Sequence, residues 1–225
     1  MEIWRTGIGL LVAVLAGPVA AHPHVFIDTT VTAVLDAEGR VTAIRLRWDY
    51  DTLVSMVVIA DKGADADGDG VISAAETGAL DGFDMTWAEG FDGDTMVFQG
   101  AAPVALVPGP QDWATGWVAD DEGGHLWSEH TRTLAAPLDP GAGLVRIVVY
   151  DVTDYTAYAL TDAGLVTETG AVPEDCRIAP PAEAPEEGGL FTTVGLFLFG
   201  RDDGAEASVV PGAAVGRVVV DLNCG

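Results

Sequence analysis

Residues 22–48 read HPHVFIDTTVTAVLDAEGRVTAIRLRW, and this stretch decides the fold. Between Val25 and Leu35 the odd-numbered positions are mostly apolar, while polar side chains concentrate at the even-numbered ones. This two-residue period is typical of a strand with one buried face. A turn with Gly39 follows, and the run Val41–Trp48 alternates in the same way. The stretch therefore predicts a β-hairpin.

Further strand-like runs continue along the chain, separated by clusters of Gly, Pro and Asp. They cover residues 95–99, 104–107, 125–134, 144–151, 155–160 and 215–222. Before them, residues 50–62 favour a helix with Asp51 as its N-cap, and residues 74–80 favour a short second helix. We therefore predict an α+β fold, mainly antiparallel β and sandwich-like, with an EF-hand-like helix-loop-helix insertion.

The loop between the two expected helices, DADGDGVISAAE at residues 65–76, has the spacing of a calcium-binding loop. The calcium ligands that this spacing predicts are Asp65, Asp67, Asp69, the Val71 carbonyl, Ser73 and Glu76. Gly70 occupies the sixth position, where such loops turn sharply. The alternative is an acidic turn, rich in Asp and Gly, that binds no metal. We predict calcium as a cofactor.

The first 21 residues have the layout of a cleavable signal peptide. Arg5 supplies a short positive region, residues 8–15 are apolar, and small residues precede a cleavage point after Ala21. The mature chain would then begin at His22. We expect an exported protein located in the periplasm.

The mature chain, residues 22–225, has the length of a single β-rich domain. Residues 180–189, PPAEAPEEGG, read as an acidic Pro-rich loop. The most apolar later run, residues 189–200, is shorter than the roughly 20 residues that cross a bilayer. No transmembrane helix is predicted in the mature chain.

The protein is strongly acidic, with 35 Asp and Glu residues against 10 Lys and Arg and a net charge of −25. Lys62 is the only lysine. Nucleic-acid binding needs clustered cations, and anionic membranes attract basic segments. Both partners are therefore excluded, and a cationic partner or a metal ion is the natural complement.

Two cysteines, Cys176 and Cys224, lie far apart in the sequence. In an oxidising compartment they favour one disulfide bond. The alternative is a thiolate metal site. Neither cysteine has a CxxC partner or a nearby histidine, and this pattern favours the disulfide.

Four histidines offer candidate transition-metal ligands. His22 and His24 lie two apart, and on a strand their imidazoles share one side. Such a pair can bind Zn, Ni, Co or Cu, and cleavage before His22 would add its α-amine as a donor. The alternative is an exposed pair on an edge strand. His125 and His130 lie on opposite faces of a strand, and one of them is expected to complete the site.

The chain resembles a family of uncharacterised periplasmic proteins. The resemblance rests on HPHVFID (22–28), RLRWDYDTLVS (45–55) before the acidic loop, YDVTDYTAY (150–158) and the two late cysteines. The family is the domain-of-unknown-function family 1007, labelled as the periplasmic component of an ABC-type transport system and associated with nickel, cobalt or zinc transport. The resemblance implies His22, His24 and His130 as the recurring histidines. It also makes Trp48, Tyr50, Asp51, Asp151 and Tyr155 family-pattern positions without a known role.

No enzyme motif is present: GxSxG, HExxH and phosphate-binding glycine loops are all absent. We therefore expect a non-enzymatic metal-binding accessory protein that assists Zn, Ni or Co transport and partners a metal transporter of the inner membrane. The first alternative is a calcium-stabilised structural or adaptor domain without a transition-metal role. The second is a copper protein that binds through an N-terminal His22.

Overall fold

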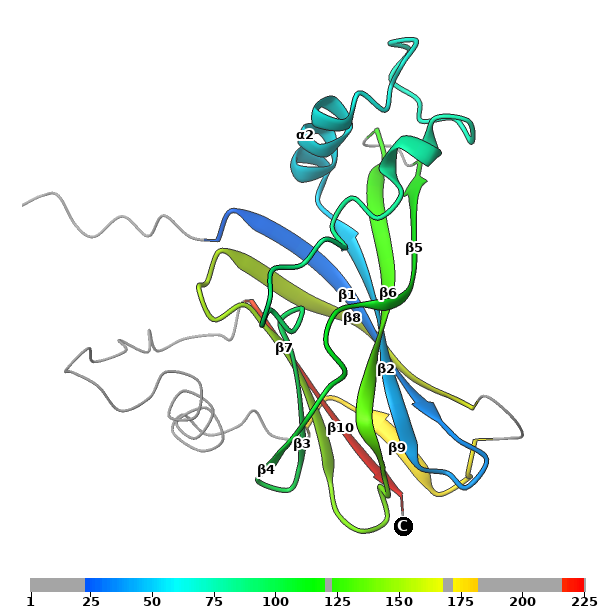
Figure 1. Ribbon diagram of the computed structural model, residues 1–225, viewed down its shortest axis with the longest axis vertical. Helices are drawn as coiled ribbons and strands as arrows, with labels where there is room; N and C mark the ends of the chain where they lie inside the picture. The colour runs from blue at the N-terminus through cyan, green and yellow to red at the C-terminus, as the bar shows by residue number, and fades with distance from the viewer. Residues whose placement is uncertain (1–22, 120–122, 168–171, 182–215, 225) are drawn as a thin grey trace, which may run out of the picture.

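Two five-stranded β-sheets form the body of the protein (Figure 1). The computed structural model describes residues 23–119, 123–167, 172–181 and 216–224. One sheet has the strand order β5-β6-β2-β1-β8, and the other has β4-β3-β7-β10-β9. The elements are β1 (Val25–Leu35), β2 (Val41–Tyr50), α2 (Thr52–Lys62), the 3-10 turn η1 (Thr77–Leu80), β3 (Thr95–Gln99), β4 (Ala102–Val104), β5 (Gln111–Val118), β6 (His125–Leu138), β7 (Val145–Tyr150), β8 (Thr156–Thr167), β9 (Cys176–Ala179) and β10 (Arg217–Cys224).

The inward faces of the two sheets share one hydrophobic core. Its fully buried members come from both sheets and include Val31, Ile44, Leu46, Leu126, Val145, Ile147, Val149, Val220 and Leu222. These residues follow the two-residue period of their strands, which places alternate side chains between the sheets. Burial of this apolar surface is the main force that holds the sheets together.

The expected hairpin is confirmed. β1 and β2 pair antiparallel, with Val31 opposite Leu46. Asp36 holds the turn, since its Oδ1 atom accepts hydrogen bonds from the backbone amides of Glu38 at 3.0 Å and Arg40 at 2.9 Å. This local network fixes the register in which the apolar sides of both strands face the core.

A parallel pairing joins β1 to β8, with Ile27 opposite Tyr158. The other strand pairs in both sheets are antiparallel. Parallel neighbours cannot be joined by a tight turn, and the chain between these two strands passes through the second sheet. The pairing brings Tyr155, just before β8, beside the start of β1, where its carbonyl accepts a hydrogen bond from the amide of His24 at 2.8 Å.

The prediction of an α+β class with a helix-loop-helix insertion is wrong, because the protein is mainly β. Within the described ranges, α2 is the one α-helix. The acidic loop is followed only by η1, a single 3-10 turn. Gly78 lies inside this turn and Gly82 follows it with a φ of 61°. Glycine lowers helix stability by about 1 kcal/mol relative to alanine, and the left-handed Gly82 redirects the chain.

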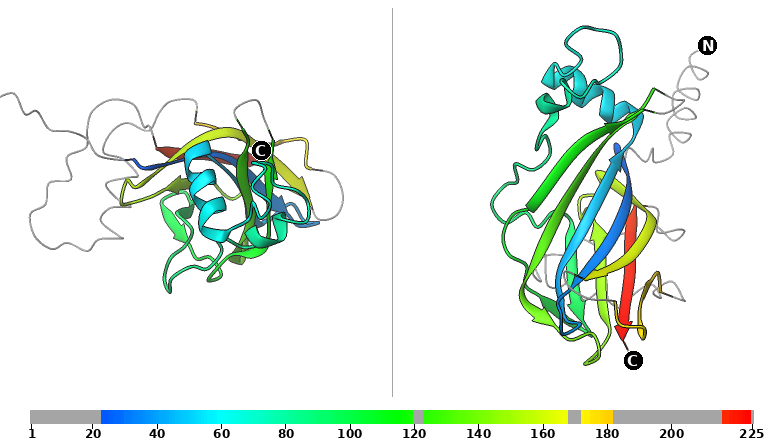
Figure 2. Two further views of the ribbon diagram at one scale, coloured as in Figure 1. Left: turned by 90° about the horizontal axis from the view of Figure 1, so that it is seen from above. Right: turned by 90° about the vertical axis from the view of Figure 1, so that its right-hand side faces the viewer.

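α2 begins and ends as its sequence predicts. Asp51 is the N-cap, and its Oδ1 atom accepts a hydrogen bond from the amide of Val54 at 2.8 Å. Gly63 ends the helix in the left-handed conformation with a φ of 60°. The buried hydroxyl of Ser55 accepts a hydrogen bond from the amide of Leu126 at 2.9 Å and fixes the helix against β6. Figure 2 shows α2 at the end of the sheets opposite to the C-terminus of β10.

Most expected strands form, with shifted ends. Residues 95–99 match β3, while β6 runs four residues beyond the expected end at Leu134. The expected strand 104–107 is instead the shorter β4. Two strands, β5 and β9, were not predicted.

The disulfide between Cys176 and Cys224 is confirmed. The two residues also lie directly opposite each other in the pairing of β9 with β10. Both cysteines of the chain are used, which removes the thiolate metal site that was the alternative.

Several predictions concern residues outside the described ranges. These are the signal peptide (1–21), His22, most of the acidic Pro-rich loop (180–189) and the apolar run 189–200. Among the helices in the described part of the chain, none is long and apolar enough to cross a membrane.

Candidate functional site

The acidic loop (residues 65–76) folds around its own carboxylates. The two oxygens of Asp65 accept hydrogen bonds from the amides of Gly68 at 2.9 Å and Gly70 at 3.1 Å. Both glycines have positive φ, 74° and 78°, a conformation that a side chain would strain. The glycines therefore let the backbone curl around Asp65, which starts the loop.

Three carboxylates converge inside this loop. One oxygen each from Asp65, Asp67 and Glu76 lies within 4.8 Å of the other two. Calcium binds oxygen at 2.3–2.6 Å, and two ligands on opposite sides of one ion are therefore about 5 Å apart. A single ion can contact all three carboxylates at this spacing. The donor set, made only of oxygens, also fits a hard cation.

The other three expected calcium ligands lie around this group. Asp69 Oδ1 accepts a hydrogen bond from the amide of Val71 at 2.8 Å. The Asp69 carboxylate is not part of the converging group. The Ser73 hydroxyl donates to Glu76 Oε2 at 2.7 Å. Ile72, between them, is buried and anchors the loop to the core. The structure thus brings together three of the six expected ligands.

Glu76, the last expected ligand, is held in its charged form. The pKa of its carboxyl is lowered to about 2, first by the hydrogen bond from the Ser73 hydroxyl. The backbone amides of Ser73 and Ala66 donate to the same carboxylate at 3.0 and 2.9 Å. Hydrogen bonds to a carboxylate favour its ionised form, which is the form that binds a metal.

His24 lies at the surface beside Tyr155. Its ring centroid is 5.1 Å from that of Tyr155, and the imidazole is exposed. His22, two residues earlier, lies outside the described ranges. The expected pair therefore has one member at an accessible position at the beginning of β1.

Two family-pattern acids beside this histidine act as local caps. Asp51 Oδ2 accepts a hydrogen bond from the amide of Phe26 at 3.0 Å, in addition to capping α2. Asp151 accepts from the amides of Thr153 and Thr156, both at 2.8 Å. These contacts hold the start of β1, α2 and β8 in place and give both acids a structural role.

His130 is in the core and is remote from His24. It is fully buried between the rings of Trp48 and Trp87, with centroid distances of 4.5 and 5.1 Å. Leu46 is opposite both His130 and Val31, and Val31 is seven residues beyond His24. At about 3.3 Å per residue, the two histidines are roughly 23 Å apart along the strand direction alone. The described structure does not bring them into one site.

The environment of His130 keeps its imidazole neutral. Burial, and to a smaller extent the nearby positive charge of Arg132, lower its pKa to about 3. Neither ring nitrogen has a hydrogen-bond partner within the described part of the chain. His125, on the other face of β6, is instead half-buried, with Nε2 3.3 Å from Asp49 Oδ1.

A buried carboxylate that the sequence did not single out belongs to Asp84, three residues before Trp87. Asp84 Oδ2 accepts hydrogen bonds from the hydroxyls of Tyr50 and Ser128, both at 2.5 Å. Burial raises the pKa of the Asp84 carboxyl. The backbone carbonyl of Asp84 also accepts from Trp87 Nε1 at 2.8 Å. Asp84 therefore pins the segment that follows η1 onto β2 and β6.

Comparison with known proteins yields one family. A family described as protein of unknown function (DUF1007) matches residues 7–188. No curated protein matches the chain.

Proposed function

The chain belongs to this family of proteins of unknown function, DUF1007, and from that premise we propose that it is an exported calcium-binding protein that serves as a transition-metal accessory to a membrane transporter. Calcium is proposed to bind at the acidic loop and to stabilise the fold. Zinc, nickel or cobalt is proposed to bind at His22 and His24, at the beginning of the mature chain.

One observation carries the calcium part of the proposal: the oxygens of Asp65, Asp67 and Glu76 lie within 4.8 Å of one another. The hydrogen bonds to Asp65 and Glu76 orient these oxygens before any ion arrives. A site of this type needs an affinity of only about 10⁻⁴ to 10⁻³ M in an extracellular setting. A structural role is favoured over a sensor role, because among the described residues the loop is followed by a 3-10 turn and not by a second helix that could move against α2.

We expect calcium to raise the melting temperature of the mature protein. At ten times the dissociation constant, binding to the folded state adds about 1.4 kcal/mol, or about 4 °C for a domain of this size. The double variant Asp65→Ala, Glu76→Ala should lose this shift in a thermal scan with and without calcium. The matched control Glu174→Ala, Asp175→Ala removes the same charge from an exposed turn and should keep it. A shift that survives in the loop variant would contradict the site.

The transition-metal part rests on the position of His24. Its imidazole is exposed, and it lies directly before β1, the first strand after the proposed cleavage point. His130 is not included, since it lies in the core, about 23 Å away along the strand direction. The resemblance described from the sequence, which implies an association with nickel, cobalt or zinc transport, also supports a transition-metal role.

We expect the mature chain, starting at His22, to bind one nickel or zinc ion. Imidazole nitrogens are favoured ligands for both ions. In a calorimetric titration, the double variant His22→Ala, His24→Ala should show no binding. The control His125→Ala should have a dissociation constant within about twofold of the wild type, well below the tenfold change that corresponds to 1.4 kcal/mol. Equal binding by the double variant would contradict the proposal.

Calcium binding without any nickel or zinc binding would favour the second candidate, a calcium-stabilised adaptor domain. The outer face of α2 favours it, because the apolar side chains of Leu53, Met56 and Val57 are exposed there. Exposed apolar helix faces are typical of protein-binding surfaces.

A further inference from the structure

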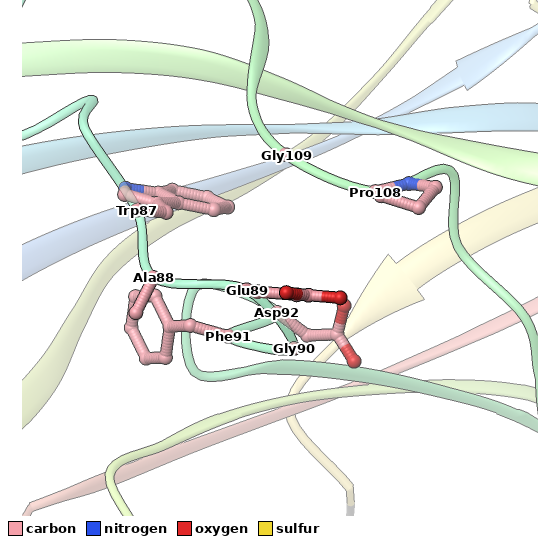
Figure 3. A pocket seen from close by; sticks show the side chains of 8 residues that line it. All are labelled: Trp87, Ala88, Glu89, Gly90, Phe91, Asp92, Pro108 and Gly109. Carbon is pink, nitrogen blue, oxygen red and sulfur yellow. The ribbon is translucent and has the colours of Figure 1, made fainter.

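A surface cavity of about 310 Å³ lies between the segment that follows η1 and the turn before β5. Its lining residues are Trp87, Ala88, Glu89, Gly90, Phe91, Asp92, Pro108 and Gly109. Figure 3 shows the carboxylates of Glu89 and Asp92 on one side, with Trp87 and Pro108 on the other. The cavity thus combines an aromatic and an apolar wall with two acids.

Three of these residues already contact the guanidinium group of Arg132, which lies in the protein interior. The side chain of Arg132 is fully buried, and its Cζ atom lies 4.8 Å from the ring centroid of Trp87. Its Nη2 atom is 3.3 Å from Asp92 Oδ1, and its Nη1 atom donates to the carbonyl of Gly109. A π-face, a carboxylate and a carbonyl are the groups that bind organic cations.

The acids of the cavity outnumber this internal cation. Arg132 contributes one positive charge, while Glu89 and Asp92 contribute two negative charges. Glu89 is exposed and makes no ion pair or hydrogen bond with the rest of the described chain. The mouth of the cavity therefore carries an excess negative charge in a protein whose net charge is already −25. A cation is the complementary ligand.

The aromatic wall is rigid. Trp87 donates its indole N–H to the backbone carbonyl of Asp84 and packs edge-on against Phe91 at 5.3 Å between centroids. Gly93 makes room for the ring, since a Cβ atom there would lie 2.2 Å from Cη2 of Trp87. A wall fixed in this way loses little conformational entropy when a ligand binds.

We propose that this cavity binds a small organic monocation, of the alkylguanidinium or alkylammonium class. The charged group lies between Glu89 and Asp92, and the alkyl part lies against Trp87 and Pro108. The volume of the cavity is at the lower end of the range for small-molecule pockets, which suits a ligand of this size. This site is separate from the acidic loop and from His24, and it does not depend on the function proposed for them.

A metal ion fits the cavity poorly. Within the part of the chain that the structure covers, the sole group of three converging metal-binding side chains is in the acidic loop. An anion fits poorly as well, because both ionisable side chains that line the cavity are acids. The aromatic wall favours an organic cation, which can contact the ring directly, over a hydrated inorganic cation.

Butylguanidinium, in a ligand-observed NMR titration of the mature protein, tests the proposal. Butylurea has nearly the same shape without the charge, and butyrate reverses the charge. We expect saturable binding of butylguanidinium and none of the other two. Glu89→Gln should weaken binding about fivefold, the effect of one partly exposed ion pair of about 1 kcal/mol. The control Glu174→Gln removes an equal charge elsewhere and should leave binding unchanged.

A blocked Gly-Arg-Gly peptide separates two sources of the same chemical group. Tighter binding of the peptide would assign the cation to an arginine of a protein partner, and tighter binding of butylguanidinium would assign it to a free small molecule. Either outcome supports a cation site. Equal binding of butylurea, preferential binding of butyrate, or an unchanged affinity in Glu89→Gln would overturn it.

Discussion

Replacing both cysteines, Cys176→Ala with Cys224→Ala, is expected to lower the free energy of unfolding by about 4 kcal/mol. The disulfide closes a loop with a sequence separation of 48 residues. Loop-closure entropy for that length corresponds to about 4 kcal/mol of stabilisation. The bond also holds β9, a four-residue strand that lies at the edge of its sheet in the described structure and pairs there with β10. A strand this short contributes little pairing energy of its own.

Urea unfolding of the wild type and of the double variant, each with and without dithiothreitol, measures this effect. Reductant should destabilise the wild type to the level of the variant and should leave the variant unchanged. An equal midpoint for oxidised wild type and variant would show that the cross-link does not contribute. A further loss in the reduced variant would point to a different target of the reductant.

Acidification is expected to destabilise the protein through His130. Its pKa is about 3 in the folded state, because burial disfavours the charged imidazole, against about 6.5 in an unfolded chain. Below pH 6.5 the unfolded state therefore binds a proton that the folded state does not. The free energy of unfolding decreases as the pH is lowered from 6.5 towards the folded-state pKa. Each pH unit in this window costs about 1.4 kcal/mol, or about 3 kcal/mol between pH 7.5 and pH 4.5.

His130→Leu removes this titration and keeps an apolar group in the core. Urea unfolding at pH 7.5 and pH 4.5 should show that the variant loses about 3 kcal/mol less than the wild type over this interval. Asp94 acts in the opposite direction, since burial raises its pKa to about 6 and acidification relieves its buried charge. This effect is common to both proteins and cancels in the comparison. Equal losses would contradict a buried neutral His130.

Local patterns predicted much of the fold. The alternation in β1 and β2, the Asp51 cap of α2 and the pairing of the two cysteines all depend on neighbouring residues or on a single choice of partner. β5 was missed because Gly116 is the one buried residue among its eight, so the strand has no alternating apolar face. Its Gly116 lies under the ring of Trp127, a contact that no sequence pattern reveals. The parallel pairing of β1 with β8 is equally long-range.

The candidate sites show the same contrast between local features, which the sequence predicted, and long-range contacts, which it did not. The three converging acids of the loop lie within twelve residues and follow a known spacing, which is why the sequence could identify them. His130 shares its face with Ser128 and Arg132, yet the sequence could not show that this face points into the core. Asp84 lies 34 residues from Tyr50 and 44 from Ser128, and only the fold brings them together.

Calcium binding at the acidic loop is tested by a calorimetric titration of the metal-free mature protein with calcium. We expect one calcium ion per chain in the wild type and none in the variant Asp65→Ala, Glu76→Ala, with binding retained in Glu174→Ala, Asp175→Ala. The absence of calcium binding in the wild type at millimolar concentration, or an equal stoichiometry in the loop variant, would contradict the account.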